Sequence, residues 1–189
     1  MREAIGFSVR ILLVAVAISM ATGLAVGGIG GGNGEIGFDF GFGQLDDEVS
    51  GDSGGRFSIR GGYFFTDLFQ LEGQSAAIVV PEAEGTNVDI SLSTFFVNAV
   101  FNFHPSDQLV PYALVGYGTA NLEFSNGGSI DDNSGAWQVA VGSRFFFGKS
   151  KRASVRVDLS YMSEETFDES SNHFSAVVGF SWRLGQEPQ

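Results

Sequence analysis

The chain has 189 residues, a length typical of one domain, with 43% apolar and 17% charged residues. Its 10 basic residues stand against 22 acidic ones, and this balance excludes the basic surface of a nucleic-acid-binding protein. The absence of cysteine excludes disulfides, zinc–thiolate sites and a cysteine nucleophile. The two histidines are too few for a multi-histidine metal cluster, and we expect no cofactor.

Residues 1–25 have the pattern of a secretory signal peptide. Arg2 and Arg10 form a basic start, an apolar stretch follows, and small residues lead to a cleavage site after Ala21 or after Ala25, of which we favour Ala25. The alternative is an uncleaved membrane helix, but the apolar run is shorter than the ~20 residues that a spanning helix needs. We therefore expect export, with a Gly-rich leader over 26–34 before the folded domain.

From residue 35 onward, apolar residues recur at every second position, which is the period of a strand with one apolar face. The first such segment alternates Ile36, Phe38, Phe40 and Phe42 with glycine and acidic residues. Similar segments follow over 57–65, 69–74, 88–103, 112–124, 137–147, 155–161 and 174–184. Within 88–103 the apolar phase changes, which we interpret as a β-bulge or a bend.

Eight long strands with no helix to cover an edge predict a closed all-β structure. We expect an eight-stranded antiparallel up-and-down transmembrane β-barrel over 35–184, with its first and last strands paired and a short tail over 185–189. Bulky phenylalanines crowd one face, whereas the other face is mostly small. The interior of such a barrel is only wide enough for side chains, so the rings should face lipid. The alternative is a soluble secreted barrel that binds an apolar ligand inside.

Charged residues on the small-residue face are expected inside the barrel, where opposite charges neutralise one another. A charge on the lipid side near mid-membrane would cost roughly 2–4 kcal/mol. The expected interior charges are Glu35, Asp39, Arg56, Arg60, Glu72, Glu123, Arg144, Arg156, Asp158 and Arg183. We expect them to form a packed polar plug rather than a conduction path.

Amphipathic aromatic residues near the strand ends predict two interfacial girdles. The expected girdle residues are Trp137 and Tyr161 on the loop side and Tyr63, Tyr112 and Trp182 on the turn side. Tyr117 is expected on the inner face. Short turns alternate with mostly longer, acidic connections such as 44–54, 125–134 and 164–171, which is the pattern of periplasmic turns and external loops.

Two stretches carry a resemblance to a known family. Residues 98–103 (NAVFNF) and 111–118 (PYALVGYG) resemble the small outer-membrane β-barrel family, which includes the membrane domain of OmpA and OmpX. The resemblance covers roughly residues 35–184 and implies an integral protein of the outer membrane, in contact with its lipids and with lipopolysaccharide. Residues 179–184 (GFSWRL) resemble the C-terminal signal read by the outer-membrane assembly machinery, although the chain continues past this strand and does not end in phenylalanine.

His173 and Ser175 share one strand face, and this His-x-Ser pattern resembles that of the lipid A deacylases. Such chemistry needs a histidine to activate the serine and an acid to orient the histidine. No acid follows on a later strand, and the expected register turns both residues inward. We therefore favour a polar strand end. An outer-leaflet lipid A-modifying enzyme is the alternative.

Acidic clusters in the connections offer oxygen ligands for Ca²⁺ or Mg²⁺. The candidates are Asp46, Asp47, Asp131 and Asp132, but none has the full EF-hand spacing, and we favour solvated loops without a metal. The sequence thus predicts a non-enzymatic, integral outer-membrane protein. We expect an envelope-structural or surface-interaction role that depends on its acidic external loops.

Overall fold

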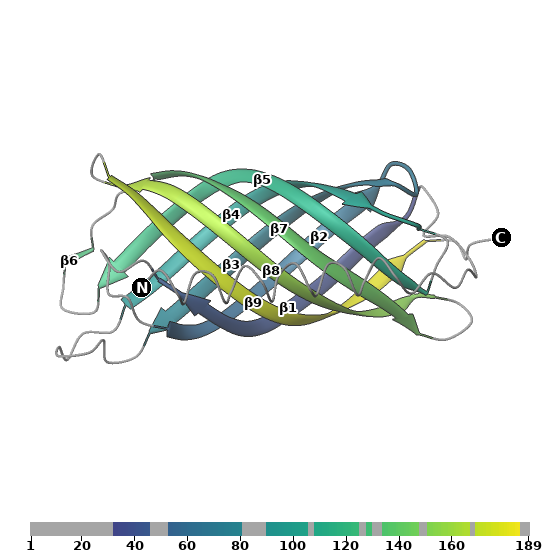
Figure 1. Ribbon diagram of the computed structural model, residues 1–189, viewed down its shortest axis with the longest axis horizontal. Coiled ribbons are helices and arrows are strands. Elements are labelled where there is room, and N and C mark those ends of the chain that lie inside the picture. The colour runs from purple at the N-terminus through teal and green to yellow at the C-terminus, as the bar shows by residue number, and fades with distance from the viewer. Residues whose placement is uncertain are drawn as a thin grey trace, which may run out of the picture.

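A computed structural model describes residues 32–45, 53–80, 90–105, 108–124, 128–129, 134–147, 151–166 and 169–185. These residues form one sheet of tilted antiparallel strands, without helices (Figure 1). The eight long strands are β1 (Gly34–Gln44), β2 (Ser53–Phe64), β3 (Phe69–Val80), β4 (Ile90–Asn102), β5 (Leu109–Phe124), β7 (Ser134–Phe147), β8 (Ala153–Thr166) and β9 (Glu169–Leu184). A two-residue strand, β6 (Gly128–Ser129), pairs with the end of β5.

The sheet closes on itself, as predicted. Each long strand pairs with the long strands before and after it, and β1 pairs with β9 from Gly34 opposite Leu184 to Gln44 opposite Phe174. Closure matters because each backbone group left without a hydrogen bond in hydrocarbon costs several kcal/mol. The prediction of an eight-stranded antiparallel barrel is therefore confirmed.

The strands are strongly staggered around the barrel. Cross-strand partners lead from Gly34 through one residue of each long strand to Phe174 on β9 and back to β1 at Gln44, which is ten residues beyond the start. Such a stagger requires strands tilted against the barrel axis, as Figure 1 shows. Together with the number of strands, it sets the width of the space that the inner side chains must fill.

Large apolar side chains cover the outside, and charged side chains lie inside. Phe38 and Phe57 are exposed on the outer face, whereas Arg60 and Arg156 are buried. Outer rings contact one another at the turn end, in the order Tyr63, Phe65, Phe69 and Phe101. This orientation is the one that a lipid-facing wall requires, and it is incompatible with the alternative of a soluble barrel with an apolar interior.

The expected bulge within 88–103 is wrong. The ladder of β4 with β3 runs from Ile90 to Phe101 and that with β5 from Ile90 to Asn102, both without a skipped residue. Ile90 and Leu92 are buried inside the barrel, whereas Phe95 is exposed outside. The apolar phase changes along β4 because the loop-side half of the interior is itself apolar.

The face assigned to β5 is also wrong. Tyr112, Leu114 and Leu122 are buried inside, and Tyr117, expected inside, is 71% exposed. A shift of one residue turns every side chain of a strand to the other face. On β5 the inner residues are as apolar as the outer ones, so alternation alone does not distinguish the two faces.

The connection between β8 and β9 is shorter than expected. The two strands pair as far as Thr166 opposite Glu169, so most of the expected loop over 164–171 is strand. Gly34, expected in the leader, begins β1. The expected signal peptide, the leader as far as residue 31, and residues 186–189 of the tail lie outside the described residues. No helix in the part of the chain that the structure describes is long and apolar enough to span a membrane.

Candidate functional site: the barrel interior

The interior is filled by a charged layer between an apolar group at each end, and a third apolar group consists of Val100, Tyr112, Leu114 and Ala140. The loop-end cluster consists of Leu45, Ile78, Val80, Ile90, Leu92, Phe96, Ala120, Leu122, Ala136 and Met162. The turn-end cluster consists of Phe64, Val110 and Phe146. Between them lies the charged belt, which we define as Glu35, Asp39, Arg60, Glu72, Arg144, Arg156 and Asp158; all seven side chains are buried.

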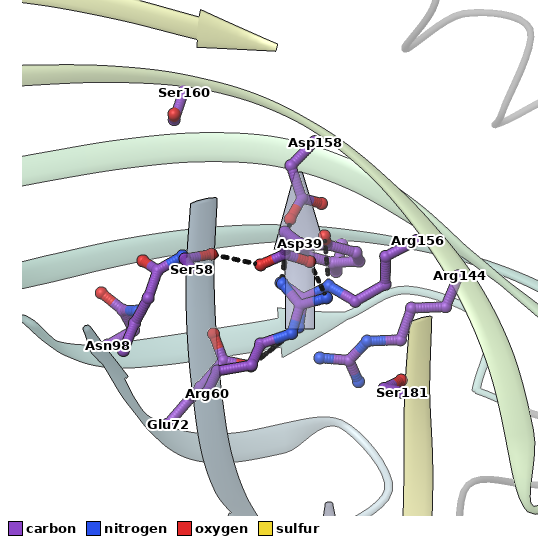
Figure 2. A network of polar contacts seen from close by, with 12 residues as sticks. Asp39, Ser58, Arg60, Glu72, Asn98, Arg144, Arg156, Asp158, Ser160 and Ser181 are labelled. Carbon is purple, nitrogen blue, oxygen red and sulfur yellow. Dashed lines mark hydrogen bonds and ion pairs between the residues drawn. The ribbon is translucent and has the colours of Figure 1, made fainter. Parts of the chain in front are cut away.

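Arg60 on β2 is surrounded by three carboxylates of the belt. It forms an ion pair with Asp39 on β1, its Nη1 lies 3.3 Å from Oδ2 of Asp158 on β8, and its Nε lies 4.0 Å from Oε2 of Glu72 on β3. Asp39 also accepts a hydrogen bond of 2.6 Å from the hydroxyl of Ser58. Figure 2 shows the guanidiniums of Arg60 and Arg156 directed at the same carboxylates. A buried charge is tolerated when it is paired and hydrogen-bonded in this way.

Arg156 on β8 links the belt to an aromatic ring. Its Nη1 lies 2.7 Å from Oε2 of Glu72, and its Nη2 lies 3.3 Å from Oδ2 of Asp158. Its Nε donates a 2.8 Å hydrogen bond to the hydroxyl of Tyr112. The guanidinium carbon also lies 4.6 Å from the centre of the Tyr112 ring, within the range of a cation–π interaction.

Arg144 on β7 is the belt residue nearest the turn end. Its Nη1 donates a 3.1 Å hydrogen bond to Oδ1 of Asn102, and its Nη2 donates one to Gln70. Its guanidinium lies over the rings of Phe64 and Tyr112. Arg144 thus joins the belt to the turn-end cluster. It uses the planar, multi-donor geometry that distinguishes arginine from lysine.

Glu35 on β1 is held more loosely. Its Oε1 lies 3.7 Å from Nη2 of Arg144 and 3.8 Å from Nη1 of Arg156, and neither carboxylate oxygen has a hydrogen bond within the described residues. Glu35 therefore contributes charge compensation rather than fixed geometry. The better-defined contacts of the belt lie around Glu72, Asp39 and Asp158.

Two of the three remaining expected interior charges, Arg183 and Arg56, lie at the two ends of the belt. Arg183 is buried near the turn end, with its guanidinium over the ring of Phe146. Arg56 is buried toward the loop end and donates from Nη1 to Ser160 and Ser175. Glu123 lies on β5, but its side chain is outside what the structure describes. Buried positive charge therefore continues beyond the belt toward both ends of the barrel.

Tyr112 was expected in the turn-side girdle, and that prediction is wrong. It is 2% exposed and lies inside the barrel, where its hydroxyl accepts from Arg156. A phenol placed between two guanidiniums gains more from cation–π and hydrogen-bond contacts than from the interface. Its cross-strand partner is Gly142, where a Cβ would overlap the Tyr112 ring. This inner-face glycine is the sequence signal that could have located a large ring opposite it.

The other four expected girdle residues lie on the outer face. Tyr63 and Trp182 are exposed at the turn end, and Trp137 is exposed at the loop end. The rings of Trp137 and Tyr161 lie 5.4 Å apart, and Tyr161 contacts Phe174 at 5.0 Å. Tyr117, the cross-strand partner of Trp137, adds a further exposed ring to this loop-side group.

His173 and Ser175 point into the barrel and contact different partners. Nε2 of His173 lies 3.0 Å from Oε1 of Glu164 on β8, and Oε2 of Glu164 lies 3.4 Å from the hydroxyl of Ser134. The hydroxyl of Ser175 accepts a 2.8 Å hydrogen bond from Arg56 and lies 2.8 Å from that of Ser160. Sequence reasoning missed the acid because Glu164 precedes the histidine and was assigned to a loop.

The described interior contains a small cavity of about 10 Å³ on the loop side of the belt. It is lined by Arg56, Ala76, Ile78, Thr94, Gln138, Ser160, Met162, His173 and Ser175. A cavity of this size holds roughly one water molecule. The space is too small for a lipid acyl chain or a sugar to reach Ser175 from inside.

The metal candidates Asp46, Asp47, Asp131 and Asp132 lie outside the described residues. Among the residues that the structure does describe, no group of three or more histidine, cysteine, aspartate or glutamate side chains is arranged to hold a metal ion. The belt carboxylates face arginines instead, so their oxygens are already engaged by positive charge.

Comparisons with known proteins agree with this architecture. Residues 9–183 match the family described as "Outer membrane protein beta-barrel domain". The chain is 26% identical to the outer membrane protein PagN of Salmonella typhimurium over 150 residues. That match covers 64% of this chain and 60% of PagN, so the chain spans less than two thirds of this relative.

Solved structures share the fold at low sequence identity. Neisserial surface protein A superposes with a TM-score of 0.67 at 13% identity, covering 80% of this chain and 98% of that one. The attachment invasion locus protein Ail of Yersinia pestis, in complex with the heparin analogue sucrose octasulfate, gives 0.51 at 20% identity, covering 80% and 99%. At these identities the likeness concerns the fold.

Proposed function

The chain belongs to the outer membrane protein β-barrel domain family and is an integral outer-membrane protein, and we propose that it is a non-enzymatic one that acts through its acidic external loops. Its barrel would serve as a rigid anchor. The role we propose is surface interaction, with a contribution to the envelope through contacts with lipopolysaccharide.

The filled interior is the observation that carries this proposal. The charged belt and the two apolar clusters occupy the lumen, and the cavity near Arg56 holds only about one water molecule. A barrel of eight strands has little space to spare once its inner side chains are in place. A function that needs a channel or an internal substrate site is therefore disfavoured. The external surface is the part of the protein that can bind a partner.

The distribution of basic residues indicates what that surface can bind. In the sequence, the ten lysines and arginines fall in three places. These are the first 25 residues (Arg2, Arg10), the strands with inward-facing arginines (Arg56, Arg60, Arg144, Arg156, Arg183) and the β7–β8 connection with its flank (Lys149, Lys151, Arg152). The loop-side connections 45–52, 81–89 and 125–133 contain acidic residues and no basic ones. A partner with positive charge, or one bridged by divalent cations, would suit such a surface.

The Ail structure provides a contrast in charge. That structure contains a sulfated heparin analogue, and a polyanion of that kind is normally bound by lysine and arginine. The loop-side connections of this chain offer no such residues. We therefore propose a cationic or cation-bridged partner, in which the anions of lipopolysaccharide and the loop carboxylates share Mg²⁺ or Ca²⁺.

Surface binding tests the proposal directly. The full-length protein in lipid nanodiscs should bind a cationic peptide surface in low salt and should bind a heparin-coated surface only in the presence of Mg²⁺. Substitution of Asp46, Asp47, Asp131 and Asp132 by asparagine should weaken both interactions. Asp67→Asn, in the β2–β3 turn at the opposite end, is the matched control and should change neither. Strong heparin binding in the presence of EDTA would contradict the proposal.

Conductance tests the closed interior separately. In planar bilayers we expect no steady open current, because the belt and both clusters block the lumen. A stable channel recorded from the purified barrel would refute the plug. The proposal of surface interaction would then depend on the surface-binding experiment alone.

Biogenesis forms a separate part of the proposal. We infer export by the segment over 1–25 and recognition of residues 179–184 by the outer-membrane assembly machinery. The alternation of Phe180, Trp182 and Leu184 supports this inference, since these residues share the outer face of β9. Replacing Trp182 and Leu184 together by serine should lower the fraction of the protein that folds into the heat-modifiable form in cells. An unchanged amount of folded protein in the outer-membrane fraction would argue against this signal.

A lipid A-modifying enzyme is the second candidate, and the Glu164–His173 pair is the observation that favours it. Two observations count against it. The hydroxyl of Ser175 is engaged by Arg56 and Ser160, and the site faces the lumen rather than the lipid. His173→Ala and Ser175→Ala should leave the acylation pattern of lipid A unchanged in cells that express the protein. An altered pattern in the wild type that either variant abolishes would establish the enzyme.

A further inference from the structure

Arg56 differs from the arginines of the charged belt. Arg60, Arg144 and Arg156 each lie within 4.0 Å of at least one carboxylate oxygen. Arg56 is only 7% exposed, yet no carboxylate of the described residues lies within ion-pair distance of it. Its Nη1 donates to the neutral hydroxyls of Ser160 at 3.1 Å and Ser175 at 2.8 Å. Asp39 and Asp158 compensate its charge only from beyond ion-pair distance, so a small anion in direct contact would lower the cost of burying this cation.

The surroundings of Arg56 also contain more donors than acceptors. Guanidinium has five N–H groups, and the hydrogen bonds that the structure gives to Arg56 use only those of Nη1. The hydroxyls of Ser160 and Ser175 lie 2.8 Å apart, so one donates to the other. The second hydroxyl hydrogen is then free to point elsewhere. Nε, Nη2 and one serine hydroxyl are therefore available as donors to a neighbouring ligand.

The cavity of about 10 Å³ adjoins these same groups. Arg56, Ser160 and Ser175 form one part of its wall, and the rest consists of the polar residues Thr94, Gln138 and His173 and the apolar residues Ala76, Ile78 and Met162. The volume corresponds to about one small sphere the size of a water molecule. Sulfate or phosphate would be too large. A single halide-sized ion is the largest anion that the space admits, with movement of the flexible Met162 side chain.

We propose that this cavity binds one small monovalent anion of the halide type, held by the Arg56 guanidinium and the Ser160–Ser175 hydroxyl pair. The nearest other charges are the belt residues Arg60, Asp39 and Asp158. Glu164 is engaged by His173 and Ser134 at the loop side. The anion gives Arg56 a negative charge at contact distance and gives the free donors an acceptor. A water molecule in its place would leave Arg56 with only the more distant Asp39 and Asp158 as negative charges.

Bromide replacement tests the site in crystals. Bromide scatters X-rays anomalously, so the full-length protein would be refolded and crystallised in sodium bromide, which also allows for slow entry through the loop-end cluster. We expect one anomalous peak inside the barrel, in contact with Arg56. The peak should be absent from crystals of Arg56→Gln. A cavity that contains only water, or is empty, at high bromide concentration would overturn the proposal.

Thermal unfolding gives a second readout in case Arg56→Gln fails to fold. At equal ionic strength, the unfolding midpoint should be higher in chloride or bromide than in gluconate, which is too large for the cavity. The difference should grow with the logarithm of the halide concentration, as expected for a ligand of the folded state. Equal midpoints in all three salts would overturn the proposal.

A second serine pair on the same two strands supplies the matched control. Ser154 and Ser181 lie 2.7 Å apart on β8 and β9, are buried, and are not part of the cavity wall. Ser175→Ala should reduce the halide-dependent shift, whereas Ser181→Ala should retain it in full. If both variants lose the shift to the same extent, or both retain it, the proposed ligand set is wrong.

Discussion

The charged belt and the loop-end cluster fill neighbouring parts of one interior by opposite means. The belt combines residues from β1, β2, β3, β7 and β8 through ion pairs, and five of its seven charges have more than one ion-pair partner. The loop-end cluster packs apolar side chains from β3, β4, β5, β7 and β8 with Leu45. In the belt, stability depends on particular contacts between atoms. In the cluster, it depends on volume and on the area removed from water.

Loss of a belt arginine should have the largest effect. Arg156→Ala leaves Glu72 and Asp158 with fewer partners and removes the donor to Tyr112. A buried charge that loses its partner typically costs about 3–5 kcal/mol. The free energy of unfolding in lipid vesicles, from a denaturant titration followed by gel mobility, should fall by that amount. A loss below about 1 kcal/mol would mean that the belt is much wetter than the structure shows.

A cavity in the loop-end cluster should lower the free energy of unfolding by less than the loss of a belt arginine, and it should disturb fewer contacts. Leu92 is completely buried, and Leu92→Ala removes apolar volume without leaving a charge unpaired. Such substitutions cost about 2–5 kcal/mol. The same titration should show this loss, and combination with Arg156→Ala should give nearly additive losses because the two residues share no partner. Strong non-additivity would mean that the cluster and the belt form one unit.

A tyrosine pair on β5 tests which face of this strand lies inside. Tyr112→Phe removes the hydroxyl that accepts from Arg156, and a hydrogen bond to a charged group is worth about 1.5–3 kcal/mol. Tyr117→Phe is the matched control, because Tyr117 is exposed on the outer face. Unfolding titrations should show a loss for the first variant and almost none for the second. The reverse order would restore the face assigned from the sequence.

An inner-face glycine next to the belt should give the smallest loss. A Cβ at Gly179 would overlap Asp39 and come within 2.7 Å of Nη2 of Arg60. Gly179→Ala should therefore displace this ion pair at a cost of about 1–3 kcal/mol. Gly61→Ala is the control, since the nearest atom to a Cβ there is a backbone oxygen at 4.0 Å. Equal stability of the two variants, measured by the same titration, would show that the ion pair has room to move.

The difference between the two regions also explains what the sequence could predict. On β1 and β2, aromatic and aliphatic residues outside alternate with charged or small residues inside, so Phe38 and Arg60 could be assigned to faces directly. The end strands of the closed sheet could be paired because no other element was available to cover them. Residues that meet across the belt, such as Glu72 and Arg156, lie far apart in the sequence, and their contact depends on the stagger of the whole barrel.

Alternation failed where the inner face of a strand is itself apolar. The loop-side half of β4 places Ile90 and Leu92 inside against serines outside, and β5 has large apolar or aromatic side chains on both faces. The rule that apolar residues face lipid therefore gave the wrong face for Leu114 and Leu122. The rule assumes a polar lumen along its full length. Here the lumen is polar only in the belt and beside it. Glycines opposite large inner rings, such as Gly142 opposite Tyr112, carry the information that hydrophobicity lacks.

The pairing of β1 with β9 has a consequence for how the protein is made. The first strand has no partner on one side until the last strand has been synthesised, and Arg156 and Asp158 reach the carboxylates and arginines of β1–β3 only in the finished cylinder. A chain truncated before β9 would present two open ladders and unpaired charges to hydrocarbon. Insertion should therefore be all-or-none along the length of the chain, with no stable half-barrel on the way.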